Sequence, residues 1–235
     1  MNLTTEPSSI EDDFNYGTNV KQATMGVRLG FLRKVYCILT AQLAITTVMC
    51  ALFISVDTLK NFAQNSQPVL IVTMVLSIGL IFALLLKRHE HPTNMYLLLA
   101  FTLVESYTVA TYVTFFKVEI VLQAFILTLS VFCILTSYTL QSKRDYSSWG
   151  AALFVGLWVL VGTGILQIFF HNDTFEMFCA SAGALLFCMF IIYDTHLIMK
   201  RLSPEEYIVA SINLYLDVIN LFMETLRILS KMNNK

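Results

Sequence analysis

Apolar residues form seven long segments along the chain, and most polar residues fall in the short stretches between them. Each segment holds about 20 residues, the length of α-helix that crosses roughly 30 Å of hydrocarbon. Because the connections are short, neighbouring segments should form antiparallel hairpins. The pattern therefore predicts an all-α membrane protein built as a seven-helix bundle. The predicted spans are 32–54, 69–87, 95–116, 119–140, 149–170, 176–198 and 206–229.

The composition agrees with this class. Of the 235 residues, 57% are hydrophobic and 13% are charged, whereas about 25% of the residues in a soluble domain are charged. The net charge is −1 and no basic stripe is present, so a nucleic-acid partner is not expected. The five cysteines form no CxxC pair, and we interpret them as apolar packing residues rather than disulfide partners or zinc ligands.

The chain is expected to have one membrane domain between two tails. We place the N-terminal tail at residues 1–30, the bundle at 31–230 and the C-terminal tail at 231–235. The first residues are polar and acidic, and no basic region followed by a short apolar run occurs there. A secretory signal peptide is therefore not expected, and the first span should act as the targeting signal.

Basic residues predict the orientation of the spans, because Lys and Arg concentrate in cytosolic loops. If every span crosses, ten of them lie on the side of the N-terminus, which is therefore predicted to be cytosolic, and Lys60 and Lys117 lie on the other side. The ten are Lys21, Arg28, Arg33, Lys34, Lys87, Arg88, Lys143, Arg144, Lys200 and Arg201.

The C-terminal end of the chain conflicts with this rule. Arg227, Lys231 and Lys235 would be luminal if the last segment crosses the membrane as a seventh span. Either the rule is overridden at this end, or the last segment is re-entrant and returns the C-terminus to the cytosol.

Four carboxylates fall inside the predicted spans: Glu105, Asp194, Asp217 and Glu224. A charged side chain at the centre of a membrane helix is unfavourable by about 2.5–3.5 kcal/mol. Such residues usually face the bundle interior and mark a functional site. Asp194 and Asp217, in the last two spans, are therefore the main candidates.

The link between the last two spans predicts that these aspartates meet. Ser203 suits the N-cap, Pro204 suits the first helical position, and Glu206 completes a capping box, so we start the last helix at Pro204. At 1.5 Å per residue, Asp194 and Asp217 then lie about 14 and 20 Å below the membrane surface. In an antiparallel hairpin the two carboxylates can face each other.

Polar residues of the last span follow one helical stripe. Asn213, Asp217, Asn220 and Glu224 are spaced by four, three and four residues, which places them on one face. A narrow polar face on an apolar helix should turn toward the bundle interior or a water-filled cavity. The alternative is an amphipathic helix that lies flat at the membrane surface, but this polar face is not basic.

Two close carboxylates in a low-dielectric site do not both ionise easily and tend to share one proton. Asp194 and Asp217, which we call the aspartate pair, could therefore sense pH. They could also bind a divalent cation, because carboxylate oxygens are ligands that Ca²⁺ prefers. A competing interpretation pairs Asp194 with Lys87, whose flexible stem could reach it from the end of the second span. Another gives both aspartates a structural role only.

Two further candidates lie elsewhere in the spans. Glu105, with Thr102, Thr108 and Tyr112, forms a small polar patch at helical spacing on the third span. This patch either lines the same cavity or hydrogen-bonds to other helices. His196, near the end of the sixth span, is expected at the membrane interface, with a pH-dependent role as the alternative.

Long stretches of the chain match a known family. They include Phe31-Leu-Arg-Lys-Val-Tyr36, Gln123-Ala-Phe-Ile-Leu-Thr128 and Tyr138-Thr-Leu-Gln-Ser-Lys143. The most specific are Phe190-Ile-Ile-Tyr-Asp-Thr-His196, Leu202-Ser-Pro-Glu-Glu-Tyr207 and Asn213-Leu-Tyr-Leu-Asp-Val-Ile-Asn-Leu-Phe222. In these segments the chain resembles the Bax inhibitor motif (lifeguard) family of multi-pass membrane proteins.

The resemblance implies six helices around a central last helix, and a pH-sensitive calcium leak from intracellular stores that protects cells from apoptosis. It implies that Asp194 and Asp217 form the pH-sensing gate. Lys87 stands near the position where a basic residue latches one aspartate in bacterial relatives, and Glu205 matches a functional glutamate of the family. The resemblance further suggests a Golgi location, with the endoplasmic reticulum as a second site. The implied partners are calcium, membrane lipids, further copies of the chain and other apoptosis-related membrane proteins.

Three other classes of function are alternatives to the calcium leak. A non-conducting regulator that acts through membrane-protein partners would use the carboxylates structurally. An intramembrane aspartyl protease would pair Tyr-Asp with Gly-x-Gly-Asp, but the second aspartate lies in Leu214-Tyr-Leu-Asp217, without the glycines that allow close backbone approach. A seven-helix receptor is disfavoured by the very short luminal loops. We therefore expect neither an enzyme nor a cofactor other than the calcium ion.

Overall fold

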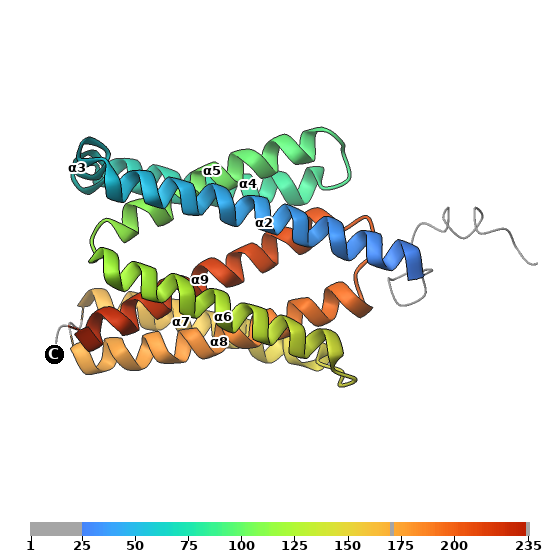
Figure 1. Ribbon diagram of the computed structural model, residues 1–235. Helices are drawn as coiled ribbons and strands as arrows, with labels where there is room; N and C mark the ends of the chain where they lie inside the picture. Colours follow the sequence, from blue (N-terminus) through green and yellow to red (C-terminus); the bar gives the residue numbers. More distant parts are fainter. Residues whose placement is uncertain (1–24, 170–171, 234–235) are drawn as a thin grey trace, which may run out of the picture.

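The computed structural model describes residues 25–169 and 172–233. The regular secondary structure of these residues is entirely helical (Figure 1). The expected N-terminal tail lies mostly outside the described residues, as do Lys21 and Lys235. The helices are α2 (Met25–Ser55), α3 (Asp57–Asn65), α4 (Gln67–Lys87), α5 (Thr93–Val113), α6 (Val118–Gln141), η1 (Ser147–Trp149), α7 (Gly150–Phe169), α8 (Asp173–Lys200) and α9 (Tyr207–Asn233).

Seven of these helices are long and apolar enough to cross a membrane, which confirms the predicted number of spans. The short helix α3 was not predicted, because its nine residues are mainly polar. It packs against α2 and α5 and buries Ala63. Helices α2 and α9 also extend beyond the expected bundle, since α2 begins at Met25 and α9 ends at Asn233.

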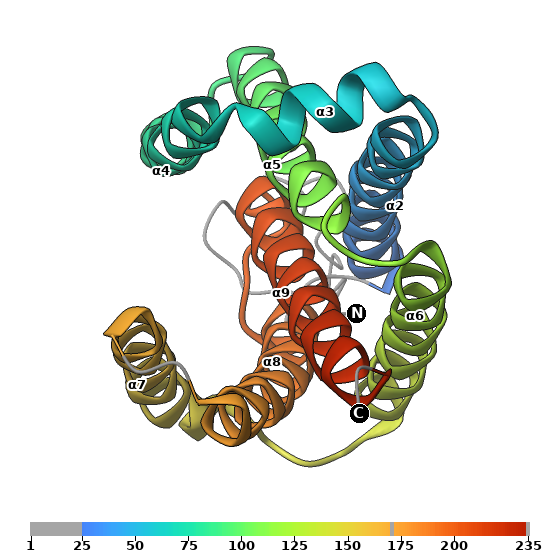
Figure 2. The same cartoon turned by 90° about the vertical axis from the view of Figure 1, so that its left-hand side faces the viewer.

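Helix α9 lies in the middle of the bundle, next to α2, α5, α6 and α8 (Figure 2). Of its most apolar 18-residue stretch, 67% is buried in the bundle, compared with 11% for α4 and 6% for α7. This burial confirms the predicted interior position of the last helix and excludes a helix lying flat on the surface. The outer helices α4 and α7 pack mainly against α5 and α8, respectively.

Helix α9 is continuous from Tyr207 to Asn233 and runs the length of the bundle (Figure 1). The structure therefore shows a full-length helix rather than a re-entrant one. Its predicted start was wrong by three residues, because Pro204–Glu206 forms a turn. Half of the predicted capping box is present, since the backbone N–H of Ser203 donates to Oε2 of Glu206 over 3.1 Å.

The bundle has two ends, which we name by what lies there. The turn end holds the link 201–206 between α8 and α9, the link 88–92 and the loop 142–149; the α3 end holds α3 and the last residues of α9 (Figure 1). The nine described basic residues of the predicted cytosolic side all lie toward the turn end. Arg227 and Lys231 lie toward the α3 end.

Candidate functional site

The aspartate pair lies between α8 and α9, the two helices with the most extensive mutual packing in the bundle. Asp194 and Asp217 are 7% and 6% exposed, and their side chains lie within hydrogen-bonding reach of each other. The predicted meeting of these carboxylates is therefore present. A hydrogen bond between two carboxyl groups requires that one of them carries a proton. The geometry thus suits a pair that shares one proton.

No basic side chain among the described residues contacts the aspartate pair. The proposed partner Lys87 instead donates to Oε1 of Glu90 over 2.8 Å, and its side chain is 49% exposed. The Lys87 latch is therefore not formed. Its helix α4 lies on the outside of the bundle, and a carboxylate three residues further along the chain satisfies the ammonium group. The pair remains without a counter-charge.

Among the described residues, no group of three or more His, Cys, Asp or Glu side chains is arranged so that it could hold a metal ion. Ca²⁺ usually takes six to eight oxygen ligands, and two carboxylates offer at most four. The aspartate pair therefore has the oxygen chemistry that suits calcium but would leave much of an ion's shell to water or to hydroxyl groups.

The next residue of α8, Thr195, belongs to a layer of hydroxyl groups beside the pair. Its side chain is fully buried, and together with Thr136 of α6 it faces the hydroxyl of Tyr36 from α2. Within the described part of the chain, none of these three hydroxyls has a partner in hydrogen-bond geometry. We call Tyr36, Thr136 and Thr195 the hydroxyl layer.

The third consecutive residue, His196, faces the loop 142–149 and is 2% exposed. Its Nε2 lies 2.8 Å from Oδ1 of Asp145 and 3.4 Å from the backbone N–H of Tyr146. Hydrogen bonds from Ser147, and more weakly from His196, keep the pKa of Asp145 below its usual range, so this carboxylate stays charged. His196 thus lies near the end of its span, as expected, and the loop 142–149 covers it.

Acidic and basic side chains are matched at the α3 end of α8 and α9. Arg227 donates to Oε2 of Glu224 over 3.0 Å and lies 3.8 Å from Glu176, while Lys231 lies 2.8 Å from Glu176 and 2.5 Å from Asp173. We call these five residues the ion cluster. The basic residues near the end of α9 therefore pair with acids at the start of α8.

Residues 28–234 match the family described as Bax1-I, inhibitor of apoptosis-promoting Bax1. The chain belongs to this family. It is 57% identical to protein lifeguard 4 of Mus musculus and 54% identical to the Golgi anti-apoptotic protein of Vaccinia virus (strain Lister), each over 97% of this chain and 96% of the relative. Bax inhibitor 1 of Schizosaccharomyces pombe is 40% identical over 95% of this chain and 84% of that protein.

Membership of the Bax inhibitor family and the seven apolar helices make the chain a multi-pass membrane protein. The family comparison fits the resemblance inferred from the motifs of α8 and α9. It covers both aspartates and the link between them, because the matched residues run from α2 to the end of α9.

The other residues singled out from the sequence of this family member do not join the aspartate pair. Glu105 accepts a 2.5 Å hydrogen bond from Ser77 of α4, and Thr108 donates to Thr73 of the same helix. Thr102, in contrast, accepts from Gln42 of α2. The polar patch of the third span therefore hydrogen-bonds to two different helices, which supports the second of the two interpretations given for it.

The polar stripe of α9 is divided in the same way. Asn213 and Glu205 are exposed, Asn220 donates to the backbone carbonyl of Leu216, and Glu224 belongs to the ion cluster. Of the stripe, Asp217 alone is found in the aspartate pair, because α9 meets a different neighbour at each turn.

Sequence reasoning missed the hydroxyl layer, the partner of His196 and the ion cluster. Tyr36 and Thr136 are ordinary residues of apolar spans and carry no signal by spacing. The ion cluster could have been found, since Asp173 and Glu176 begin one span at the same end where Arg227 and Lys231 close the next. Opposite charges at the same level of an antiparallel pair are expected to meet.

Proposed function

We propose that the protein is a pH-sensitive calcium leak channel or transporter of intracellular stores, and that it inhibits apoptosis. The observation that carries this proposal is a buried pair of carboxylates between α8 and the central helix α9, with no basic partner among the described residues. A charged side chain is energetically unfavourable at such a position, and the ionisable residues found there usually mark an ion or proton path. The aspartate pair is the proposed gate.

The gate would respond to pH through the shared proton. When both carboxylates are ionised, they hold a cation between α8 and α9, and an ion that is held tightly leaves slowly. Protonation or replacement of an aspartate removes negative charge and weakens this binding. Calcium flux is therefore expected to rise as the pair is protonated.

The turn end is proposed to face the cytosol and the α3 end the lumen. Nine basic residues toward the turn end support this orientation, because they outnumber Arg227 and Lys231 near the α3 end. A Golgi location is proposed because one relative is named a Golgi anti-apoptotic protein; the endoplasmic reticulum is the second proposed site. Inhibition of apoptosis follows the names of that relative and of the matched family.

The experiment that tests the channel is calcium efflux from proteoliposomes that contain the purified full chain. Wild-type protein should release calcium, and empty liposomes or liposomes with an unrelated seven-helix protein should not. Absence of flux from wild-type protein at every pH from about 5 to about 8 would exclude the channel.

One observation favours the alternative of a non-conducting regulator that binds membrane-protein partners. Helix α7 packs mainly against α8, and only 6% of its apolar window is buried (Figure 2), so most of its surface is free for lipid or another helix. A variant with both aspartates changed to Asn distinguishes the calcium channel from the non-conducting regulator. If it protects cells as well as wild type while its calcium flux is altered, protection does not depend on the gate.

A further inference from the structure

We infer that the hydroxyl layer, Tyr36, Thr136 and Thr195, is a hydrated site that connects the aspartate pair to the turn end of the bundle. In this role it binds water and the oxygen shell of a passing cation. The inference rests on the proposed ion path for its second part, but the hydration of the site is separable from conduction and can be measured alone.

The hydroxyl layer lies next to the aspartate pair along α8. Thr195 follows Asp194 on α8, and one further residue of the same helix, His196, is closed off by the loop 142–149. The three hydroxyls come from α2, α6 and α8, so they lie where three helices meet. An ion or water molecule moving from the aspartate pair toward the turn end on this side of α8 therefore meets hydroxyl oxygens next.

Apart from one another, these three hydroxyls have no polar partner in the described part of the chain. Thr195 and Thr136 are 0% and 8% exposed, and the hydroxyl of Tyr36 is buried. Both threonines approach the Tyr36 hydroxyl, yet none of the three has a partner in hydrogen-bond geometry among the described residues. Buried hydroxyl groups are usually hydrogen-bonded, and Thr in a membrane helix commonly bonds to a carbonyl of the preceding turn. Three such groups facing one another suit a small bridging species with two to four polar partners.

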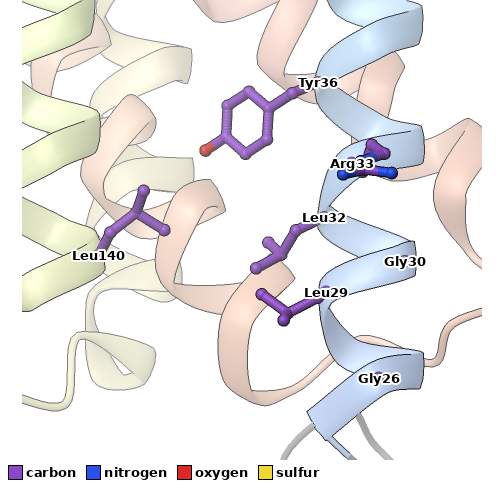
Figure 3. Close-up of a pocket in the computed structure, with 7 residues that line it drawn as sticks. All are labelled: Gly26, Leu29, Gly30, Leu32, Arg33, Tyr36 and Leu140. Carbon is purple, nitrogen blue, oxygen red and sulfur yellow. The ribbon is translucent and has the colours of Figure 1, made fainter.

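An opening at the turn end reaches Tyr36. A groove of about 520 Å³ runs between α2 and α6 and includes Tyr36 in its wall. Figure 3 shows the ring of Tyr36 extending from α2 toward α6, above Leu32 and Leu140. The other lining residues are Gly26, Leu29, Gly30 and Arg33. Tyr36 therefore belongs both to the wall of this groove and to the hydroxyl layer.

The cation part of the inference is tested by calcium efflux from proteoliposomes with Tyr36→Phe and Thr195→Val. Each change removes one hydroxyl and keeps the shape of the side chain. We expect the initial rate to fall by roughly fivefold, the size that follows when one neutral hydrogen bond is lost from a rate-limiting site. Thr195→Ser, which keeps the hydroxyl, should restore the wild-type rate.

Matched controls come from α5, near the α3 end. The hydroxyls of Tyr107 and Thr111 are also buried without a partner in the described part of the chain, but they lie away from the aspartate pair. Tyr107→Phe and Thr111→Val should keep the rate within about twofold of wild type. Rates for Tyr36→Phe and Thr195→Val that match those of the controls would overturn the assignment of the layer to the ion path.

Hydration is tested without any flux by hydroxyl-radical footprinting of the wild-type protein in proteoliposomes, since radicals form from water and oxidise tyrosines beside it. Tyr36 should be oxidised several-fold faster than Tyr107, although both rings are part-buried. Equal, low oxidation of the two would refute a hydrated site, whereas fast oxidation of Tyr36 in a protein that passes no calcium would support the site and contradict the proposed channel alone.

Discussion

Helices α8 and α9 hold acidic side chains at two levels, and the two levels differ in what surrounds the acids. In the ion cluster each acid has a base: Glu224 has Arg227 at 3.0 Å, and Glu176 has Lys231 at 2.8 Å. In the aspartate pair the carboxyl groups have only each other among the described residues. The same two helices therefore carry one neutralised site and one that lacks a counter-charge.

The difference separates a fixed contact from one that can change. Arg227 is a permanent counter-charge, because the guanidinium is always protonated. Together with Lys231 it binds Glu176 of α8 and so joins α9 to α8 at the α3 end. A carboxyl pair without a base binds or releases a proton instead, so its contact between the helices depends on pH. The ion cluster is thus the expected fixed end of the helix pair, and the aspartate pair the variable one.

The largest effect on stability is expected from Arg227→Met. This change leaves Glu224, whose side chain is 12% exposed, and Glu176 without their shared base. Because the site is partly exposed, we expect the free energy of unfolding to fall by about 2–3 kcal/mol, less than for a fully buried pair. Thermal unfolding in detergent measures this. Arg201→Met is the control, since Arg201 is 56% exposed and lies 3.8 Å from its acid; equal losses for the two would contradict the comparison.

A smaller effect is expected when one member of the aspartate pair is neutralised. Asp194→Asn or Asp217→Asn keeps the shape of the side chain and removes no salt bridge. We expect the free energy of unfolding to change by less than about 1 kcal/mol, or to rise. Glu224→Gln is the matched control at the other level and should lower stability by about 1–2 kcal/mol, because Arg227 loses its nearest carboxylate. The reverse order would indicate that a base does stabilise the pair.

Lys231→Met should have a still smaller effect. The ammonium group is bonded to Asp173, whose side chain is 88% exposed, and to Glu176. Exposed ion pairs contribute about 0–1 kcal/mol. We expect a loss within this range that disappears in 1 M salt, where the screening length is about 3 Å. A loss that persists in salt would place Lys231 in a more buried site than the structure does.

The smallest effect is expected from Lys87→Met, which tests the latch directly. Lys87 pairs with Glu90 on the surface, so stability should change by no more than about 0.5 kcal/mol. The pH dependence of calcium flux should match that of wild type. A shift of that pH dependence would show that Lys87 reaches the aspartate pair in a conformation other than this one.

The level of the aspartate pair was predictable from the sequence, and the level of the hydroxyl layer was not. Charge inside an apolar span is conspicuous, and an antiparallel hairpin of known rise places Asp194 opposite Asp217 within a turn of helix. Tyr36 and Thr136 belong to helices distant in the sequence, and only packing brings them to Thr195. The number of spans followed from segment length, whereas α3 and the start of α9 depended on local contacts that hydropathy does not record.

The partners of Lys87 and His196 differ from those expected from the sequence. Lys87 was given a buried partner from its distance along the helix, but a nearer carboxylate in the sequence satisfies it. His196 was expected near the end of its span, but its contact with a loop that begins more than 50 residues earlier was not predicted. In both cases the backbone position was right, and the choice of partner depended on the connecting loops.

The central claim is that the aspartate pair controls calcium passage through its protonation. Calcium efflux from proteoliposomes, measured from about pH 5 to pH 8, tests it with wild type, Asp194→Asn and Asp217→Asn, and with Glu224→Gln as the control. Wild type and Glu224→Gln should release calcium faster at low pH. The two aspartate variants should release it fast at every pH, since the charge that holds the ion is already reduced. Flux from both variants with the pH dependence of wild type would contradict the account.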